Sequence, residues 1–452
     1  MAILTQKQPL HSEVPAPLAG KFKGSFAYDT IRDRLPTILT KVIDTVHRRR
    51  HDILAKYGEA GGADVKAVVG RLSELRHLMT TDKELTEFET ELPDGRLWSD
   101  CLKDALAKVG GRPGEVTWFQ SSWLHSECYM YRRIALAFEK SVHLQEFDPF
   151  TFLKEQAFLS SLEPMEVLAE YLLGVVGQAS TTAEEEKLAL AEFLQLSLWG
   201  NKCDLSISAG QHHKVDSRAV LEQTQKLKAH VLVDDLDAIC DFLWKKKKPE
   251  GAAAAVHVVL DNAGMELFSD LCLADFLLEK ELARKIVFHA KDIPWFVSDT
   301  TSADFNWTLE MLRSSQKRAL NELGHKWHRR LENGQFELQS HPFWTSPYSY
   351  DEMASVAPDL HKTLSEARLI LFKGDLNYRK LTGDLQWPFE TPFVAALRGF
   401  HPAPFAALRT LKADLCVGLT VEQVEKLNAQ HNGTIEWTFS GEYAVIQAKL
   451  EP

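Results

Sequence analysis

The chain has 452 residues, of which 45% are hydrophobic and 25% charged, the composition of an ordinary globular protein that can bury a large core. Its formal net charge of −11 argues against broad binding to nucleic acid or to an anionic membrane surface. No apolar run is long enough to span a bilayer and the first residues lack a signal pattern, so we expect a protein of the cytosol or the nucleus.

The cysteines exclude two kinds of site. No two of the six form a Cys-x-x-Cys pair, so neither a zinc knuckle nor a thioredoxin-like site is indicated. We expect reduced, mostly packed thiols, as in proteins of a reducing compartment.

The first half of the chain is predicted to be helical. Residues 1–25 are rich in proline and polar residues, and we expect them to be loosely held. Apolar residues then recur at helical spacing, which predicts helices from Leu35 onward and at 65–80, 122–140, 150–176, 182–198, 218–229 and 230–244. Thr182 and Glu185 have the spacing of a capping box. Almost nothing before residue 245 has the pattern of a strand, so residues 26–245 are predicted to form a helical domain.

The second half has a different pattern, which begins at the segment KKKKPEGAAAA. Continuous apolar runs typical of parallel strands covered on both faces follow at 256–260 (VHVVL), 284–290 (RKIVFHA) and 367–372 (ARLILF). They alternate with helical stretches such as Met265 to Leu282, and the last residues, TIEWTF–SGEY–AVIQAKL, predict a closing hairpin. The predicted fold is therefore of the α/β class: an N-terminal helical part packed on a three-layer α/β/α sandwich, residues 246–452, with a mostly parallel sheet.

Polar residues at the ends of the apolar runs are the candidate site, because ligands of open α/β sheets bind beyond the carboxyl ends of the strands. Asp261 and Asn262 end the first run, and they supply the oxygen ligands that a hard divalent cation prefers. Asp299 lies 38 residues beyond Asp261, room for one helix and one strand, and is a candidate third ligand. The alternative for these residues is that they cap the helices that follow.

Basic residues follow the third run. The segment KGDLNYRKLTGD, residues 373–384, is predicted to be a glycine-punctuated loop in which Lys373, Arg379 and Lys380 bind a phosphate beside Asp375 and Asn377. The alternative is a turn with solvated charges. In the segment LRTLKAD, Arg409 and Lys412 would share one face if the segment were helical.

Several other kinds of phosphate or hydrolase site are excluded by missing motifs. The chain has no G-x-x-x-x-G-K-[ST], no G-x-S-x-G and no H-E-x-x-H. Cys128 lacks the loop of a cysteine phosphatase, and Asp261 does not begin an Asp-x-Asp motif. The residues themselves therefore favour phosphoryl chemistry assisted by a metal ion.

The set LDNAGMEL, FVSDT, KGDLNYRKLTGD and LRTLK resembles the metal-dependent damage-control phosphatases, once called domain of unknown function 89. The run Arg409-Thr410-Leu411-Lys412 is similar to the R-T-x-K signature of subfamily III, and the acidic residue methyltransferase-type members are the most alike. The resemblance implies a metal-dependent phosphoric monoester hydrolase that acts on sugar phosphates such as fructose 1-phosphate and fructose 6-phosphate. It also implies the fold given above.

The resemblance assigns roles to individual residues. Asp261, Asn262 and Asp299 would hold Mn²⁺, Co²⁺, Ni²⁺ or Mg²⁺, with Asp261, Asp299 and Lys412 as the catalytic set. By the resemblance, the phosphorylated metabolite would be bound by Lys412 and by the loop that contains Asp375, Asn377, Tyr378 and Arg379. The interpretation of the basic segment adds Lys373 as a phosphate ligand. Further candidates, for the sugar hydroxyls or for supporting contacts around the site, are Glu127, Asn201, Asp204 and Glu266. For Glu127 and Asn201 a buried hydrogen-bond network between the two parts is the alternative. The nucleophile, water or an aspartate, stays open, with water favoured.

Two other functions remain as alternatives. The first is S-adenosylmethionine-dependent methylation of glutamates in a protein substrate, for which the resemblance would place cofactor contacts at Asp204 and Glu266. However, the turn after Asn262 contains only Gly264, where methyltransferase loops use several glycines. The second is a protein that binds a phosphometabolite without catalysis.

Overall fold

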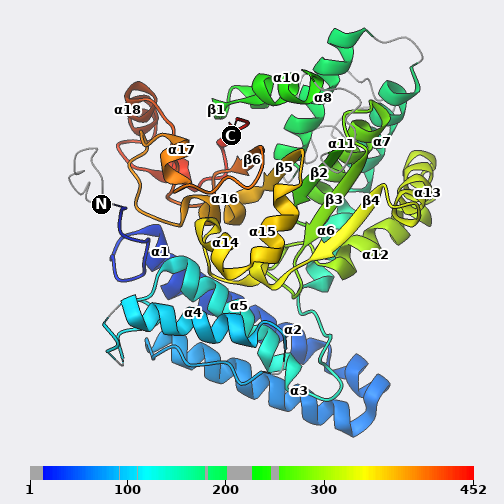
Figure 1. Ribbon diagram of the computed structural model, residues 1–452. Coiled ribbons are helices and arrows are strands. Elements are labelled where there is room, and N and C mark those ends of the chain that lie inside the picture. The colour runs from blue at the N-terminus through cyan, green and yellow to red at the C-terminus, as the bar shows by residue number, and fades with distance from the viewer. Residues whose placement is uncertain are drawn as a thin grey trace.

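A seven-stranded sheet with helices on both faces forms one part of the molecule, and a helical body lies beside it (Figure 1). The computed structural model describes residues 14–90, 92–108, 110–112, 114–178, 182–200, 226–245 and 254–451. The predicted helix at 218–229 falls mostly outside these ranges, as does most of the segment where the sequence pattern changes, residues 245–255.

The sheet is mostly parallel. Its strands are β1 (Val231–Asp234), β2 (Ala255–Val259), β3 (Lys285–Ala290), β4 (Phe336–Ser340), β5 (Leu369–Lys373), β6 (Phe405–Thr410) and β7 (Ala444–Lys449). They lie in the order β1-β7-β6-β5-β2-β3-β4, and only the pairing of β6 with β7 is antiparallel. The three apolar runs are β2, β3 and β5 to within two residues, so the predicted α/β class is confirmed.

The two faces of the sheet are buried in two different cores. In β5, Leu369 and Leu371 point into one core, and Ile370 and Phe372 point into the other, because side chains alternate along a strand. The first core contains α7 (Leu162–Gly177), α8 (Ala183–Leu198), α10 (Leu236–Lys245), α11 (Met265–Glu279), α12 (Ser302–Arg313) and α13 (Arg318–Glu332). The second contains α14 (Met353–Val356), α15 (Pro358–Ser365) and α16 (Gly374–Thr382).

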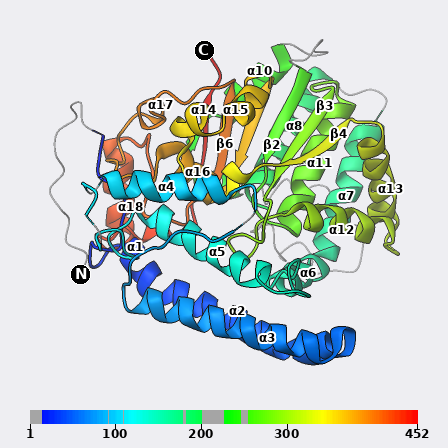
Figure 2. The same ribbon diagram turned by 60° about the horizontal axis from the view of Figure 1, so that its bottom comes forward.

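The second core continues into the helical body. This body consists of α1 (Phe26–Asp29), the π-helix η1 (Thr30–Arg34), α2 (Leu35–Arg48), α3 (Arg50–Thr80), α4 (Gly95–Lys108) and α5 (Trp123–Glu139). Helix α5 is buried along most of its length and lies between the α2–α3 pair and the sandwich (Figure 2). Shorter elements are α6 (Thr151–Ser160), η3 (Pro342–Thr345), η4 (Tyr350–Glu352), α17 (Phe393–Ala396), α18 (Val421–Gln430) and η5 (Glu436–Thr438).

Most predicted helices are present, and the capping box at Thr182 and Glu185 is confirmed. The single helix predicted at 150–176 is wrong, because the helix is interrupted at Ser161, which separates α6 from α7. The helix predicted at 230–244 is also wrong in its first turn. There the β-branched segment VLVD forms β1 against β7. The strand β1 and the helices α7, α8 and α10, all within the range predicted as the helical domain, therefore take part in the sandwich.

The predicted C-terminal hairpin is wrong. Residues Glu436–Thr438 form the short helix η5, with Trp437 fully buried, and only β7 is a strand. Strand β7 finds its partners elsewhere, antiparallel to β6 and parallel to β1. Alternation of polar and apolar residues marked β7 correctly but could not identify the strand that pairs with it.

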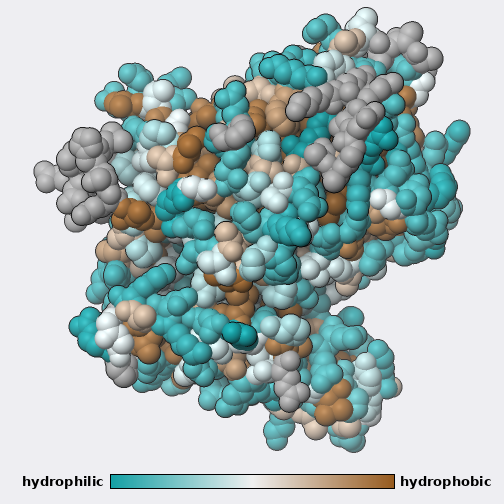
Figure 3. Space-filling model, viewed as in Figure 1, coloured by the Kyte–Doolittle hydropathy of each residue, from teal (hydrophilic) through white to brown (hydrophobic). Residues whose placement is uncertain are grey.

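The exposed surface has no large apolar face on the side shown in Figure 3, where hydrophilic residues surround small hydrophobic patches. Within the described residues, no helix is both long and apolar enough to cross a membrane. The described cysteines, which are all except Cys203, are buried and form no disulfide.

A buried pair of histidines in the sheet makes stability sensitive to acid. The rings of His257 in β2 and His289 in β3 lie nearly parallel, with 5.1 Å between their centres and 2.9 Å between His257 Nδ1 and His289 Nε2. Burial lowers the pKa of His257 to about 4 and that of His289 well below its usual value, so both rings are neutral at pH 7. One ring then donates its proton to the other, a bond that two imidazolium ions could not form.

We expect this pair to cost stability as the pH falls. The folded state binds the proton more weakly than the unfolded chain, so stability declines below about pH 6.5 and the loss from His257 is complete near pH 4. That loss amounts to about 3 kcal/mol. The test is the fall in melting temperature between pH 7.5 and pH 5.0, which should be larger for the wild type than for His257→Gln. The comparison with the variant is needed because carboxyls with a raised pKa, such as Asp270, change stability in the opposite direction over this pH range. Equal declines in the two proteins would contradict the expectation.

Candidate active site

The candidate site lies where the sheet changes winding direction, between β2 and β5. From β2 the chain continues to β3 and β4 on one side, and then returns to β5 and β6 on the other. Loops at such a point diverge and leave a crevice at the carboxyl ends of the strands. Asp261 follows β2 and Gly374 follows β5, so both belong to this edge.

Gly374 lets the two loops approach each other. Its φ is +82°, and a Cβ atom added to it would lie 1.9 Å from Asp261 Oδ2. No other residue both tolerates this backbone conformation and leaves room for the carboxylate. The glycine therefore fixes the place of the Asp261 side chain against the start of α16.

The loops after β2 and β3 are joined by backbone hydrogen bonds. Ala263 N donates to Ser298 O and Thr300 N donates to Asp261 O, each at 2.8 Å, on either side of a bridge between Asn262 and Asp299. All three predicted metal ligands thus lie at one edge of the sheet and are buried.

Negative charge accumulates at this edge. Burial raises the pKa of Asp261 well above its usual value, and repulsion from Glu266 and Asp299 adds to the effect, against the attraction of Lys412 and Lys291. Burial also raises the pKa of Asp299, which Lys291 opposes. These three carboxyl groups are shielded from water and repel one another, so a bound cation would stabilise the arrangement.

The donor set fits a divalent cation only if the amide joins it. No group of three His, Cys, Asp or Glu side chains in the described part of the chain is arranged to hold a metal ion. Asn262 Nδ2 donates to Asp261 Oδ2 and to Glu266 Oε2, both at 2.8 Å, while its Oδ1 accepts from Ser298 Oγ. A half-turn of the amide would direct its oxygen to the carboxylates, and the Ser298 hydroxyl can accept from the amide nitrogen as readily as it donates.

Lys373 is placed differently from the prediction, which aimed its ammonium group at a phosphate. The group is fully buried and contacts Ser197 O at 2.6 Å, Asp270 Oδ1 at 2.8 Å and Glu266 Oε1 at 3.2 Å. Burial raises the pKa of Asp270 to about 6 although Lys373 opposes the shift. Lys373 therefore neutralises part of the charge of Glu266 and holds it beside Asn262, one of the predicted metal ligands.

The loop conformation predicted for residues 373–384 is wrong, because Gly374–Thr382 forms the helix α16. Asn377 and Tyr378 face inward: Asn377 Nδ2 donates to Lys373 O at 2.7 Å, and the Tyr378 hydroxyl donates to Gln447 Oε1 at 2.7 Å. Glycines at both ends of the segment suggested a loop, but they mark the turn into the helix and its left-handed C-cap, Gly383.

Arg379 joins the sandwich to the helical body. Its guanidinium donates to both carboxylate oxygens of Asp384, at 2.7 and 3.1 Å, and to Glu127 Oε2 at 2.7 Å. It also lies over the ring of Trp123, 3.6 Å from the ring centre. Arg379 and Glu127 thus form the buried network between the two parts that sequence offered as the alternative for Glu127.

The R-T-x-K run is strand and loop, not helix, so the condition under which Arg409 and Lys412 would share a helical face is not met. Asp375 Oδ1 accepts from Arg409 Nε at 2.8 Å and from the backbone N of Lys412 at 3.2 Å. The Lys412 side chain is exposed, and its ammonium group has no hydrogen bond or ion pair with any described residue. Asp375 thereby fixes the loop that carries Lys412, whose unpaired ammonium group lies near enough to Asp261 to attract its carboxyl group.

Sequence reasoning missed Lys291, which directly follows β3. Its ammonium group donates to Leu260 O at 2.7 Å and pairs with Asp299 Oδ2 at 3.1 Å. Its position at a strand end, which had singled out the other site residues, could have identified it. Asn201 and Asp204 lie outside the described residues.

The chain matches known proteins over nearly its full length. The family described as Damage-control phosphatase ARMT1-like domain matches residues 30–427. The Damage-control phosphatase ARMT1 of Homo sapiens is 44% identical over 437 residues, 96% of this chain and 98% of the human protein. The protein of the same name from Danio rerio is 42% identical over 439 residues, 96% of each chain. A solved structure of a DUF89 family protein from Pyrococcus horikoshii matches with a TM-score of 0.37 and 16% identity, over 75% of this chain and 88% of that one.

Proposed function

Since this chain belongs to the damage-control phosphatase ARMT1-like family, we propose that it is a metal-dependent hydrolase of phosphoric monoesters that acts on sugar phosphates. The observation that carries the proposal is the junction of the Asp261 and Asp299 loops, where mutually repelling carboxyls lie buried beside an uncommitted Lys412. Such an edge can hold a cation on one side and a phosphate on the other.

We assign the metal to Asp261, Asp299 and the amide oxygen of Asn262. When bound, a divalent cation supplies positive charge to the phosphoryl group. Glu266, held by Lys373 and Asn262, adds a third carboxyl close enough to repel both aspartates, and Lys291 pairs with Asp299. Mn²⁺, Co²⁺, Ni²⁺ and Mg²⁺ are the candidates, because all accept oxygen ligands of this kind.

The substrate's phosphate would lie on the open side of this edge. Lys412 reaches it as a flexible cation, and the N-terminus of α11, which follows Gly264, adds a favourable field. Asp375 keeps Lys412 in reach by accepting from its backbone N. We favour water over an aspartate as the nucleophile, because both aspartates are engaged as ligands. Fructose 1-phosphate and fructose 6-phosphate are the first substrates to test.

We expect protein stripped with a chelator to release no phosphate from these two sugar phosphates, and at least one of the four cations to restore release. The same cation should raise the melting temperature, because it binds only the folded state. Undiminished release by the stripped protein would contradict the assignment. Thermal stabilisation by a metal and a sugar phosphate without release would instead indicate a binding protein, and saturable S-adenosylmethionine binding in calorimetry would support the methyltransferase alternative.

A further inference from the structure

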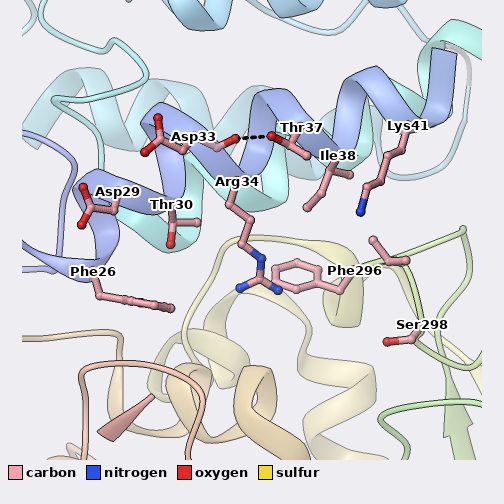
Figure 4. Close-up of a pocket in the computed structure, with 11 residues that line it drawn as sticks. Phe26, Asp29, Thr30, Asp33, Arg34, Thr37, Ile38, Lys41, Phe296 and Ser298 are labelled. Atoms are coloured by element: carbon pink, nitrogen blue, oxygen red, sulfur yellow. Dashed lines mark hydrogen bonds between the residues drawn. The ribbon is translucent and has the colours of Figure 1, made fainter. Parts of the chain in front are cut away.

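A cleft of about 630 Å³ lies beside the candidate site, and the proposed reaction does not use it (Figure 4). One wall is formed by α1, η1 and α2, with Phe26, Arg34, Ile38 and Lys41 among its residues. The other wall is the loop of residues 296–298, which precedes the predicted metal ligand Asp299. The cleft thus lies between the helical body and the sandwich.

The cleft reaches the metal edge through Ser298. This residue lines the cleft, and its hydroxyl donates to Asn262 Oδ1 at 2.5 Å. Phe296 in the same wall stacks on the buried Tyr131, with 4.7 Å between ring centres and 23° between ring planes. A molecule bound at the metal edge could therefore extend into the cleft past Ser298.

The loop wall is held in an unusual conformation. Phe296 and Val297 have φ values of +44° and +70°, a region that a β-branched residue such as valine rarely enters. Strained conformations of this kind cluster at binding and catalytic sites. On the opposite wall, Arg34 ends a π-helix, an element that is itself frequent at functional sites.

Two cations in the cleft have no partner. Arg34 and Lys41 are exposed, and their side chains make no hydrogen bond or ion pair with any described residue. Both side chains point across the cleft toward the 296–298 loop (Figure 4). The two carboxylates of the lining, Asp29 and Asp33, point away from them and are paired with Arg32 at 2.9 and 2.6 Å. The part of the cleft nearest Ser298 therefore offers uncompensated positive charge beside the ring of Phe296.

We propose that Arg34 and Lys41 form a second anion subsite, which takes a phosphate or carboxylate at the end of the substrate remote from the phosphate that is cleaved. The inference rests on the proposed function and narrows its substrate class to doubly anionic sugar derivatives. Phe26, Ile38 and Phe296 supply apolar surface against the carbon chain, while the two cations bind the second charge.

The test compares three substrates: a hexose 6-phosphate, a hexose 1,6-bisphosphate and a hexonic acid 6-phosphate. For Arg34→Gln/Lys41→Gln, kcat/KM should fall at least about tenfold with either doubly anionic compound and less than about twofold with the monophosphate. The bisphosphate and the phosphohexonate distinguish a second phosphate from a carboxylate as the group bound. Equal losses with all three substrates, or no loss with any, would overturn the subsite.

A matched control separates binding from general attraction of anions. Arg48→Gln/Lys66→Gln removes the same two charges from exposed positions of α2 and α3 outside the cleft, and should change no ratio between substrates. A change equal to that of the cleft variant would overturn the proposal in favour of long-range steering.

Calorimetry keeps the subsite testable if the proposed reaction is wrong. The hexose bisphosphate should bind the wild-type protein at least about tenfold more tightly than it binds the cleft variant, whether or not phosphate is released. If no compound is hydrolysed while this difference persists, the proposed function fails and the subsite stands. Equal affinities would end the subsite even if hydrolysis is observed.

Discussion

Replacing Asp261 by asparagine is expected to abolish phosphate release while leaving the metal-free protein at least as stable as the wild type. The substitution keeps the size of the side chain and can still accept from Asn262 Nδ2, but it removes one of three carboxyl groups that repel one another. Loss of a group whose charge is needed at the reacting centre lowers kcat/KM by roughly 1000-fold or more.

Two measurements check this expectation. Phosphate release from the preferred sugar phosphate should fall to background with every cation tested, and the melting temperature of the chelator-stripped variant should equal or exceed that of the wild type. The stabilisation given by the cation should also disappear. Glu310→Gln removes an exposed carboxylate from α12 and serves as the control, because it should leave all three quantities unchanged. Release at the wild-type rate by the Asp261 variant would show that the metal assignment is wrong.

The second large effect concerns Arg379, for which family resemblance implied substrate binding and the structure shows buried ion pairs. Arg379→Met should destabilise the protein by about 3–5 kcal/mol, because it leaves two buried carboxylates, Asp384 and Glu127, without the cation that pairs with them. Arg379→Lys should not restore stability, since an ammonium group cannot form the paired bonds to Asp384 or lie flat on Trp123.

A combined variant separates the two roles of Arg379. Adding Glu127→Gln and Asp384→Asn to Arg379→Met removes the unpaired charges and should recover part of the lost melting temperature. A residue that only bound phosphate would behave differently: its loss would raise KM and leave the melting temperature unchanged. That outcome for Arg379→Met would contradict the structural role.

Sequence predicted those parts of the fold and site that depend on local pattern. The continuous apolar runs at β2, β3 and β5 identified the parallel sheet, and the polar residues at their ends brought Asp261 and Asn262 to the edge where Asp299 lies. The physical reason is general: the carboxyl ends of parallel strands share one edge, so the place of a strand fixes the place of the residue that follows it.

The parts that failed depend on contacts distant in sequence. Cationic residues of the 373–384 segment suggested a phosphate loop. The fold instead brings Asp270 and Glu266 to Lys373 and Glu127 to Arg379, which also pairs with the nearby Asp384. A buried cation with its partner and a cation awaiting a phosphate look alike in sequence. The sequence pattern likewise identified β7 as a strand but could not identify β6 and β1 as the strands that pair with it, because the pairing is set by the whole sheet.

We propose that Asp261 and Asp299 bind the same metal ion. Diffraction from crystals of the protein soaked in Mn²⁺ tests this proposal most directly, because anomalous scattering locates the ion independently of turnover. The site described above predicts one strong peak at the β2–β5 edge, within roughly 2.0–2.3 Å of carboxylate oxygens of both Asp261 and Asp299, with the amide oxygen of Asn262 turned toward it. A peak elsewhere, or one bound by only one of the two aspartates, would contradict it.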